Sequence, residues 1–333
     1  MNEIRAIVSD IKKGNIKPIY FLMGEEPYYI DKISDFIEQN ILDETEKGFN
    51  QQIMYGRDSS IEDIVSSAKR YPMMADKQVI IVKEAQDLSR NIEKLVSYAE
   101  NPQPTTVLVL NYKYKKLDKR KKLCKAIAKS GLLFESKKLY ENQVSDWIRR
   151  VLSGKKHQIE PKAAQMLVEF LGTDLSKISN ELDKLVLILP KETIITATHI
   201  EDNIGISKDF NNFELRKSLG EKNIVKANRI IKYFSENPKN NPLVMTISLL
   251  NSFFTQLLMF HALQDKSKSS VAKALGVSPY FVGEYFIAAR NYPMRKVASI
   301  IALLREADLK NKGVGANQSQ YDILKELLFT ILH

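Results

Sequence analysis

The stretch KPIYFLMGEEPYYIDKISDFI, residues 17–37, indicates the fold of the first part of the chain. Its opening, residues 17–24, is a short apolar run that ends in glycine, as in a buried strand. The residues after the loop carry apolar side chains at helical spacing, namely Tyr29, Ile33, Phe36 and Ile37. A strand, a short loop and a helix are therefore expected in succession.

Four more segments have the composition of strands, namely residues 50–56, 77–84, 104–112 and 131–139. The run KQVIIVKE at 77–84 is rich in β-branched residues, which is typical of a central parallel strand. An amphipathic helix is expected between the first two, with Ser59 and Glu62 at capping-box spacing. Pro72 disfavours helical geometry at Tyr71, so the helix should end there. Strands that alternate with helices predict a parallel α/β sheet.

After Tyr140 the strand patterns fade, and helical patterns continue to the end of the chain. Residues 141–210 favour short helices and residues 211–333 favour longer ones. The sequence therefore predicts the class α/β plus all-α, with a parallel-sheet domain over residues 1–140 and two helical domains after it. The longer helices are expected at residues 223–234, 243–264 and 295–309.

The stretch LVMTISLLNSFFTQLLMFHAL, residues 243–263, carries no charge over a length that could cross a bilayer. Polar side chains are spread along it, and each would need a partner in hydrocarbon. A helix buried among other helices is therefore expected, with Asn241 and Pro242 at its start, and no membrane contact is predicted. The polar residues are Thr246, Ser248, Asn251, Ser252, Thr255, Gln256 and His261.

The composition is ordinary for a globular protein, with 44% apolar and 27% charged residues. A net charge of +10 favours an acidic partner such as nucleic acid. The single cysteine, Cys124, excludes an internal disulfide and fits a reducing cytoplasm, and the N-terminus lacks the pattern of a signal peptide. The four histidines have no metal-ligand spacing, so no metal is expected.

The loop GEEPYYIDK after the first strand stands where an ATPase would bind phosphate. Such a loop needs Gly-x-x-x-x-Gly-Lys-Ser/Thr, whose backbone N–H groups wrap the phosphates. Here Glu25 and Glu26 would repel phosphate, and Pro27 has no N–H to donate. Lys83 also replaces the aspartate that would hold magnesium, so neither ATP hydrolysis nor a bound cofactor is expected. The degenerate nucleotide site comprises Gly24, Glu25, Glu26, Lys83 and Glu84.

The segment Tyr71, Pro72, Met73 and Met74 follows the expected helix end and places two large apolar side chains where solvent should reach them. Methionine is flexible and suits an adaptable apolar groove on a partner. From the residues alone, packing of both side chains into the chain's own core is the favoured interpretation, because apolar pairs are usually buried.

Residues 113–125, KYKKLDKRKKLCK, hold eight Lys or Arg and one acid, Asp118. A cluster of this kind can bind phosphates in a sequence-independent and salt-sensitive way. A solvated helix face is the alternative interpretation. The candidate DNA-binding residues are Lys113, Lys115, Lys116, Lys119, Arg120, Lys121 and Lys122.

Residues 269–290 imitate a DNA-reading helix-turn-helix. A recognition helix needs Arg, Asn, Gln or Lys near its start to contact base edges. Residues 279–284, PYFVGE, are apolar and acidic instead. We therefore expect this segment to pack against other helices rather than to read bases.

Six stretches, taken in order, resemble the delta subunit of the bacterial DNA polymerase III clamp loader. They are PIYFLMGEEPYYID, AKRYPMMADKQVIIVKEAQ, NYKYKKLDKRKKLCKAI, DLSKISNELDKLVL, SVAKALGVSPYFV and LLREADLKNKG. The resemblance covers nearly the whole chain and rests on the order and spacing of these stretches together.

The resemblance implies an AAA+ type fold in three parts: an α/β domain (1–140), a small helical lid (141–210) and a helical collar (211–333). It implies a subunit that binds the sliding clamp (beta), opens the ring or holds it open, and helps load it onto primed DNA without hydrolysing ATP. The clamp contact falls on Tyr71 to Met74, where the two methionines replace a Leu-Phe-like pair that the family commonly carries.

The implied partners are the gamma/tau and delta prime subunits, joined through the collar in a cytoplasmic heteropentamer. The isolated chain is expected to be a monomer. As part of the DNA-directed DNA polymerase III holoenzyme, it is expected to have no activity of its own, since the sequence has no carboxylate pair suited to two polymerase metals. Two alternatives stay open: an active DNA-dependent, helicase-like ATPase, and a helix-turn-helix DNA-binding regulator.

Overall fold

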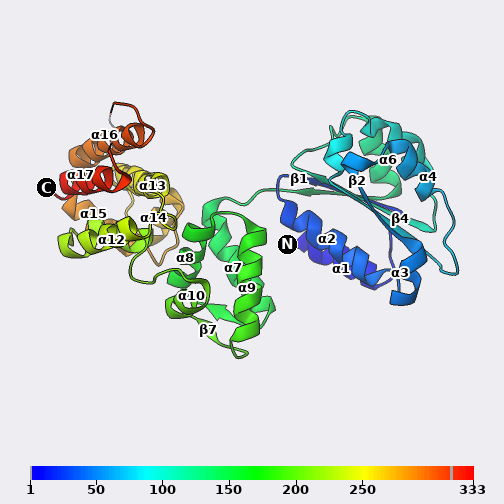
Figure 1. The fold of residues 1–333 in the computed structure, drawn as a ribbon, viewed down its shortest axis with the longest axis horizontal. Helices are drawn as coiled ribbons and strands as arrows, with labels where there is room; N and C mark the ends of the chain where they lie inside the picture. Colours follow the sequence, from blue (N-terminus) through cyan, green and yellow to red (C-terminus); the bar gives the residue numbers. More distant parts are fainter. Residues whose placement is uncertain (1, 316–317) are drawn as a thin grey trace. The chain divides into compact units, whose positions relative to one another are not determined.

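The computed structural model describes residues 2–315 and 318–333. These form two compact units that divide between Leu139 and Tyr140. Figure 1 shows the first unit, in blue to cyan-green, and the second, in green to red. The first holds a parallel sheet and the second is mostly helical, which confirms the class α/β plus all-α.

A five-stranded sheet in the order β2-β3-β4-β1-β5 forms the centre of the first unit, and all neighbouring strands are parallel. Strands β1, β3 and β4 are almost wholly buried, as the apolar runs predict. All five strands overlap the segments that the sequence indicates. They are β1 (Ile19–Gly24), β2 (Gln51–Tyr55), β3 (Gln78–Lys83), β4 (Thr106–Lys113) and β5 (Leu132–Ser136).

Helices cover both faces of this sheet, with α1 and α2 on one side and α4 and α6 on the other (Figure 1). The core beneath α4 and α6 includes Phe21 and Leu110 from the strands and Ile64 and Ile127 from the helices. The helices are α1 (Asn2–Lys12), α2 (Pro27–Asn40), α3 (Glu44–Asn50), α4 (Ile61–Ala68), α5 (Val96–Glu100) and α6 (Lys122–Ser130). Three short 3₁₀ turns also occur in this unit: η1 (Gly56–Asp58) between β2 and α4, and η2 (Ala85–Leu88) and η3 (Ile92–Leu95) between β3 and α5.

The capping box of α4 lies one residue later than expected. Ser60 accepts the N–H of Asp63 at 3.1 Å, and the Asp63 carboxylate accepts the N–H of Ser60 at 3.1 Å. The predicted pair, Ser59 and Glu62, has the same spacing, but the cap is Ser60, and α4 begins at Ile61.

The second unit contains helices α7 to α17 and one small parallel strand pair. The helices are α7 (Glu141–Gly154), α8 (Pro161–Leu171), α9 (Leu175–Ile188), α10 (Ala197–Ile204), α11 (Asn212–Gly220), α12 (Ile224–Glu236), α13 (Leu243–Ala262), α14 (Lys268–Leu275), α15 (Val282–Asn291), α16 (Met294–Asn311) and α17 (Gln320–Leu332). The strand pair, β6 (Gln158–Ile159) and β7 (Ile194–Ile195), was not expected from the sequence. The three predicted long helices correspond to α12, α13 and α16.

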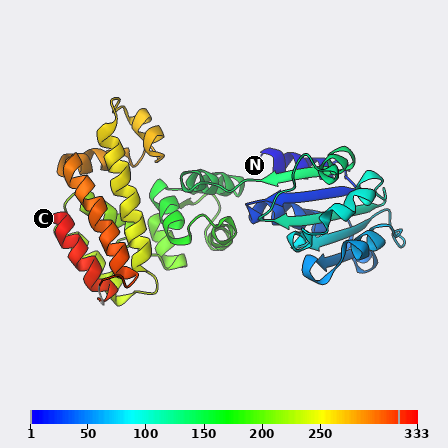
Figure 2. The same cartoon turned by 90° about the horizontal axis from the view of Figure 1, so that it is seen from above.

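Helix α13 is the core helix of the second unit. It is the one helix among the described residues that is long and apolar enough to cross a membrane, but its Phe253, Phe254 and Leu257 are buried in this unit's core. In Figure 2 it is the yellow helix that lies along α16. Its Gln256 amide donates to the carbonyl of Leu275 at 3.1 Å. These contacts support the expectation of a helix buried among helices.

The segment that imitates a helix-turn-helix forms α14 and α15, and α15 packs inward. Val282 and Tyr285 are buried, and Glu284 pairs with Arg216 of α11 at 3.0 Å. The Arg216 guanidinium also lies 4.7 Å from the ring centre of Phe213, within cation–π range. The start of α15 is therefore occupied by packing and by an internal ion pair.

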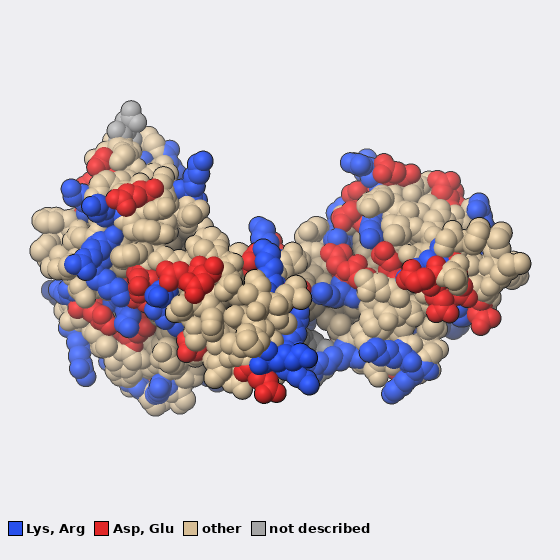
Figure 3. Space-filling model, turned by 60° about the horizontal axis from the view of Figure 1, so that its bottom comes forward, with Lys and Arg blue, Asp and Glu red and all other residues tan. Residues whose placement is uncertain are grey.

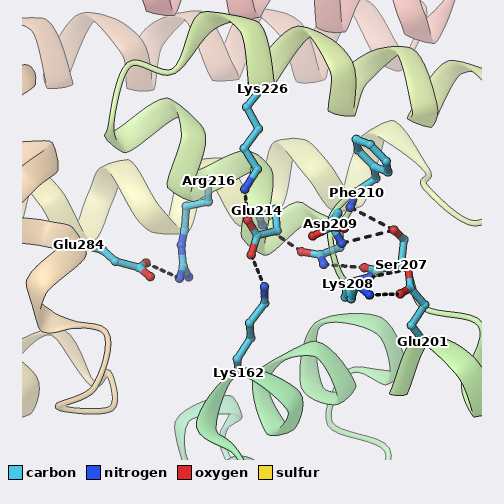
Figure 4. A network of polar contacts seen from close by, with 11 residues as sticks. Lys162, Glu201, Ser207, Lys208, Asp209, Phe210, Glu214, Arg216, Lys226 and Glu284 are labelled. Carbon is cyan, nitrogen blue, oxygen red and sulfur yellow. Dashed lines mark hydrogen bonds and ion pairs between the residues drawn. The ribbon is translucent and has the colours of Figure 1, made fainter. Parts of the chain in front are cut away.

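A buried carboxylate joins three helices of the second unit (Figure 4). Glu214 of α11 pairs with Lys162 of α8, at 2.6 Å, and with Lys226 of α12. Burial acts to raise the pKa of Glu214, but the two lysines outweigh this effect and hold the pKa below its usual range. Glu214 thus connects helices on both sides of residue 210, where the expected lid ends and the expected collar begins.

Candidate functional site

The segment Tyr71 to Met74 lies between α4 and β3 and exposes large apolar side chains. Tyr71 is 78% exposed, Met73 60% and Met74 100%, whereas Pro72 is half-buried. The side chains therefore do not fold back into the chain's own core, which was the favoured interpretation from the residues alone. Exposed apolar side chains gathered in one segment are typical of a binding surface.

The backbone of this segment is fixed by the side chain of Asn50, the last residue of α3. The Asn50 carbonyl oxygen accepts the N–H of Met73 at 2.6 Å, and its amide donates to the Met73 carbonyl at 2.9 Å. Asn50 itself is 5% exposed. Met74 follows with φ of +53°, a left-handed conformation that non-glycine residues rarely adopt.

The start of the segment is held by buried polar side chains of the sheet. The Gln78 amide donates to the carbonyl of Arg70 at 2.5 Å and to the Thr106 hydroxyl at 2.7 Å. That hydroxyl donates to the carbonyl of Ala68 at 2.8 Å. These side chains satisfy carbonyls that have no intrahelical donor, since Pro72 has no N–H to offer Ala68, and α4 ends at Ala68 rather than at Tyr71 as predicted.

The degenerate nucleotide loop is filled by the chain's own oxygen atoms. The N–H groups of Glu25 and Glu26 donate to the carbonyl and the hydroxyl of Ser136, each at 3.2 Å. The Glu26 carboxylate, 5% exposed, accepts the N–H of Tyr28 at 3.2 Å at the start of α2, a position that suits an anion. Gly24 has φ of +125°, and a Cβ there would lie 2.1 Å from the Ser136 carbonyl.

Lys83 and Glu84, the remaining residues of the degenerate site, form ion pairs with other side chains of the first unit. Lys83 pairs with Glu38 of α2 at 3.4 Å. Glu84 pairs with Lys113 at 2.9 Å and accepts from Gln86 at 2.6 Å. Burial acts to raise the pKa of Glu84, but these two partners hold it below its usual range. No cluster of His, Cys, Asp or Glu suited to a metal is found among the described residues.

Lys113, the first candidate of the basic segment, is a half-buried structural residue. Its side chain is 14% exposed, and its ammonium lies 2.9 Å from both Asp31 and Glu84. Burial acts to lower the pKa of Lys113, but the two acids outweigh it and raise the pKa. The side chain therefore neutralises acids between α2 and the ends of β3 and β4.

Most other cations of the basic segment also have partners within the first unit. Acidic and basic side chains lie interspersed on the face of the first unit seen in Figure 3. Lys122 forms no ion pair with any acid in the part of the chain that the structure describes. The contacts are Lys115 with the Gln86 carbonyl (3.3 Å) and Ser89 (3.0 Å), Lys116 with Glu25 (3.1 Å) and Glu135 (3.2 Å), Lys119 with Glu135 (3.1 Å), Arg120 with Asp118 (2.8 Å) and Lys121 with Glu93 (3.4 Å).

Two residues that organise the site were missed by the sequence analysis. The sequence pattern assigns Asn50 to the start of a strand and Ser136 to the last part of another. The available signal for Asn50 is weak: asparagine is common at helix C-termini. Ser136 carries no local signal, because its contact with the loop spans 110 residues.

Family models settle the relationship of the chain to known proteins. The model described as "DNA polymerase III, delta subunit" matches residues 20–137, and "DNA polymerase III delta subunit, C-terminal domain" matches residues 209–329. The chain belongs to the delta-subunit family of DNA polymerase III. The first match contains both candidate surfaces, the segment Tyr71 to Met74 and the basic segment.

Relatives agree with this assignment. "DNA polymerase III subunit delta" of Bacillus subtilis (strain 168) is 26% identical over 313 residues, which is 91% of this chain and 90% of the relative. "Probable DNA polymerase III subunit delta" of Aquifex aeolicus (strain VF5) is 19% identical over 309 residues, 88% of this chain and 82% of the relative. The resemblance stated from the sequence is thereby confirmed.

A solved structure supports the fold over the full length. The Bacillus subtilis DNA clamp loader delta protein superposes with a TM-score of 0.57 at 25% identity and covers 99% of both chains. The chain is a clamp-loader delta subunit and, by family, a component of the DNA polymerase III holoenzyme. Replication is therefore its process.

Proposed function

We propose that the chain binds the sliding clamp (beta) through Tyr71, Pro72, Met73 and Met74, and opens the ring or holds it open during loading onto primed DNA. The observation that carries the proposal is the exposure of both methionine side chains on a segment with a hydrogen-bonded backbone. An ordered segment that exposes apolar side chains loses little conformational freedom on binding and gains their burial.

The expected strength follows from the area that the methionines can bury. Moving one methionine side chain from water to an apolar pocket is worth about 1.5–3 kcal/mol. The pair therefore accounts for roughly two to four orders of magnitude in affinity. Met74 is fully exposed and Met73 only 60% exposed, so Met74 has more surface to bury and is the main anchor in this proposal.

The chain, in this proposal, does not hydrolyse ATP. The N–H groups that would wrap a phosphate are bound to Ser136 and Glu26, and a phosphate would have to displace a buried carboxylate. Lys83 stands where magnesium would need an oxygen ligand. Its sister subunits gamma/tau would supply ATP turnover.

DNA contact is assigned to the exposed end of the basic segment. Exposed ion pairs are worth about 0–1 kcal/mol, so a phosphate can replace their acidic partners. Lys119 and Arg120 are 73% and 90% exposed and are paired only at the surface, and Lys121 and Lys122 lie beside them. Lys113 is excluded from this role by its burial and its two acids. Binding through these side chains would be independent of sequence.

For the second unit, we retain the division implied by the family: a lid over residues 141–210 and a collar over residues 211–333. The collar would join gamma/tau and delta prime in a cytoplasmic heteropentamer, and the isolated chain would be a monomer. The inward packing of α15 supports a structural role for this region rather than base reading.

The deciding experiment is clamp binding by calorimetry. The wild type is compared with Met73→Ala combined with Met74→Ala, and folding is checked by circular dichroism. Tight wild-type binding that weakens by roughly two to four orders of magnitude in the folded double variant supports the role and the anchor. Absence of wild-type binding would overturn the proposed function, and measurable ATP turnover by the chain alone would favour the ATPase alternative.

A control uses partly exposed methionines elsewhere in the chain. Met259 and Met294 are 46% and 50% exposed and lie in the second unit. Met259→Ala combined with Met294→Ala removes the same atoms from the surface. Clamp affinity should be unchanged in this control. An equal loss in both double variants would mean that binding does not depend on the segment Tyr71 to Met74.

A further inference from the structure

We infer that Asn50 is a positioning residue that holds the segment Tyr71 to Met74 in the conformation that the clamp recognises. This inference rests on the proposed function, because it names the side chain that prepares the clamp-binding segment. Asn50 does not touch the partner in this account, since its side chain is buried. It acts through the backbone of Met73.

Asn50 contacts Met73 through two hydrogen bonds. The carboxamide of Asn50 pairs with both the N–H and the carbonyl of Met73, at 2.6 and 2.9 Å. Both polar backbone groups of Met73 are thereby turned toward α3. The Met73 and Met74 side chains are left 60% and 100% exposed. One buried amide thus determines which side of the segment is presented.

The position of Asn50 is itself fixed by α3. Its amide also donates to the carbonyl of Glu46, at 3.2 Å, one turn earlier in the helix. The start of that helix is closed by a capping box in which the N–H of Asp43 donates to the Glu46 carboxylate at 3.0 Å. The Asn50 carboxamide therefore has little freedom, and its two bonds to Met73 have a fixed direction.

The segment needs such a constraint because Met74 adopts an uncommon backbone conformation. Its φ of +53° lies in the left-handed region, which non-glycine residues occupy only when the surrounding structure requires it. A segment released from Asn50 would populate extended conformations in which the side chain of Met74 points elsewhere. Fixing the bound conformation in advance lowers the entropy cost of association.

The test combines Asn50→Ala with the methionine pair in a double-mutant cycle measured by calorimetry with the purified clamp. In the wild-type background, Asn50→Ala should weaken clamp binding roughly tenfold, since two hydrogen bonds that order the segment are lost. In the Met73→Ala, Met74→Ala background, the same change should have almost no further effect. That loss of additivity is a readout that a merely structural role would not produce.

Asn40→Ala is the matched control. The Asn40 amide donates to the carbonyl of Phe36, one turn earlier in α2, at 2.8 Å, so this change removes the same kind of bond at another helix end of the same unit. Clamp affinity should not change. Unchanged affinity in Asn50→Ala, or an equal loss in both backgrounds of the cycle, would overturn the inference while leaving the proposed function intact.

Hydrogen exchange in the wild type keeps the inference testable if Asn50→Ala does not fold. The Met73 amide hydrogen is bound by a buried acceptor, whereas no hydrogen bond from the Met74 amide is found among the described residues. The Met73 amide should therefore exchange more slowly than that of Met74, although both side chains are exposed. Equal, fast exchange at both positions would show that the Asn50 contact does not persist in solution and would overturn the inference.

Discussion

The segment Tyr71 to Met74 and the basic segment, residues 113–125, differ in which side chains have no partner within the chain itself. The first has its backbone bound to Asn50 and its apolar side chains exposed. The second has most of its charges paired with acids of the same unit. In the sequence the second is the more conspicuous, yet in the structure the first has more to gain from a partner.

The comparison shows why residue type alone is a poor guide to a binding surface. Lys113 is one of the candidate cations, but burial between Asp31 and Glu84 gives it a structural role. Met74 is apolar, and apolar residues are usually buried, but here it is fully exposed. A partner binds what the fold leaves exposed and without an internal contact.

The largest effect is expected at Met74. Met74→Ala alone should weaken clamp binding by about one to two orders of magnitude, because one fully exposed methionine is worth about 1.5–3 kcal/mol when buried. Met73→Ala should cost less, since part of its side chain is already covered in the free chain. Calorimetry on both single variants measures the difference. The reverse order would move the main anchor to Met73.

Lys113 tests the other half of the comparison. Lys113→Met should lower the free energy of unfolding by about 1–3 kcal/mol, since it leaves Asp31 and Glu84 without their shared partner. Urea denaturation measures this change. Lys122→Ala, the control, should leave stability within about 0.5 kcal/mol of the wild type. A stable Lys113→Met chain that has lost DNA binding would contradict the structural role of Lys113.

The effect of Lys113→Met on stability should depend on pH. The folded state holds the pKa of Glu84 below its usual range, so the Glu84 contribution is fully present above the ordinary glutamate pKa of about 4.3. It is lost as pH falls through the lower folded value. The difference in unfolding free energy between Lys113→Met and wild type should therefore be larger at pH 7 than at pH 3. A difference that is constant with pH would argue against a charge contact.

The smallest effect is expected at the exposed cations. The logarithm of the DNA-binding constant falls linearly with the logarithm of the salt concentration, and each phosphate contact contributes about 0.9 to the steepness of this slope. A triple alanine variant of Lys119, Lys121 and Lys122 should therefore make the slope shallower by up to about three. Binding to oligonucleotides at several salt concentrations measures the slope. The triple alanine variant of Lys12, Lys13 and Lys17, exposed in the same unit, should keep the wild-type slope. Equal slopes in both variants would place the DNA contact elsewhere.

Much of the fold could be predicted because the local spacing of apolar residues indicates where strands and helices form. The five strands and the long helices α12, α13 and α16 overlap the segments that the sequence indicates. The errors lie at element ends: α4 begins at Ile61 and stops at Ala68. The carbonyls of its last two residues, Ser67 and Ala68, accept from Gln78 and Thr106, which local pattern cannot connect to the helix.

The amino-acid sequence is sufficient to predict the α/β and helical parts, the loss of the phosphate loop and the family. Residue types and their spacing are enough for these, since they decide which side chains can be buried and which N–H groups exist. Which groups remain free depends instead on contacts between residues that are far apart in the sequence. Asn50 and Met73 are 23 residues apart, Glu84 and Lys113 are 29 apart, and Glu26 and Ser136 are 110 apart. The register of the parallel sheet brings such pairs together, and register depends on the whole domain folding at once.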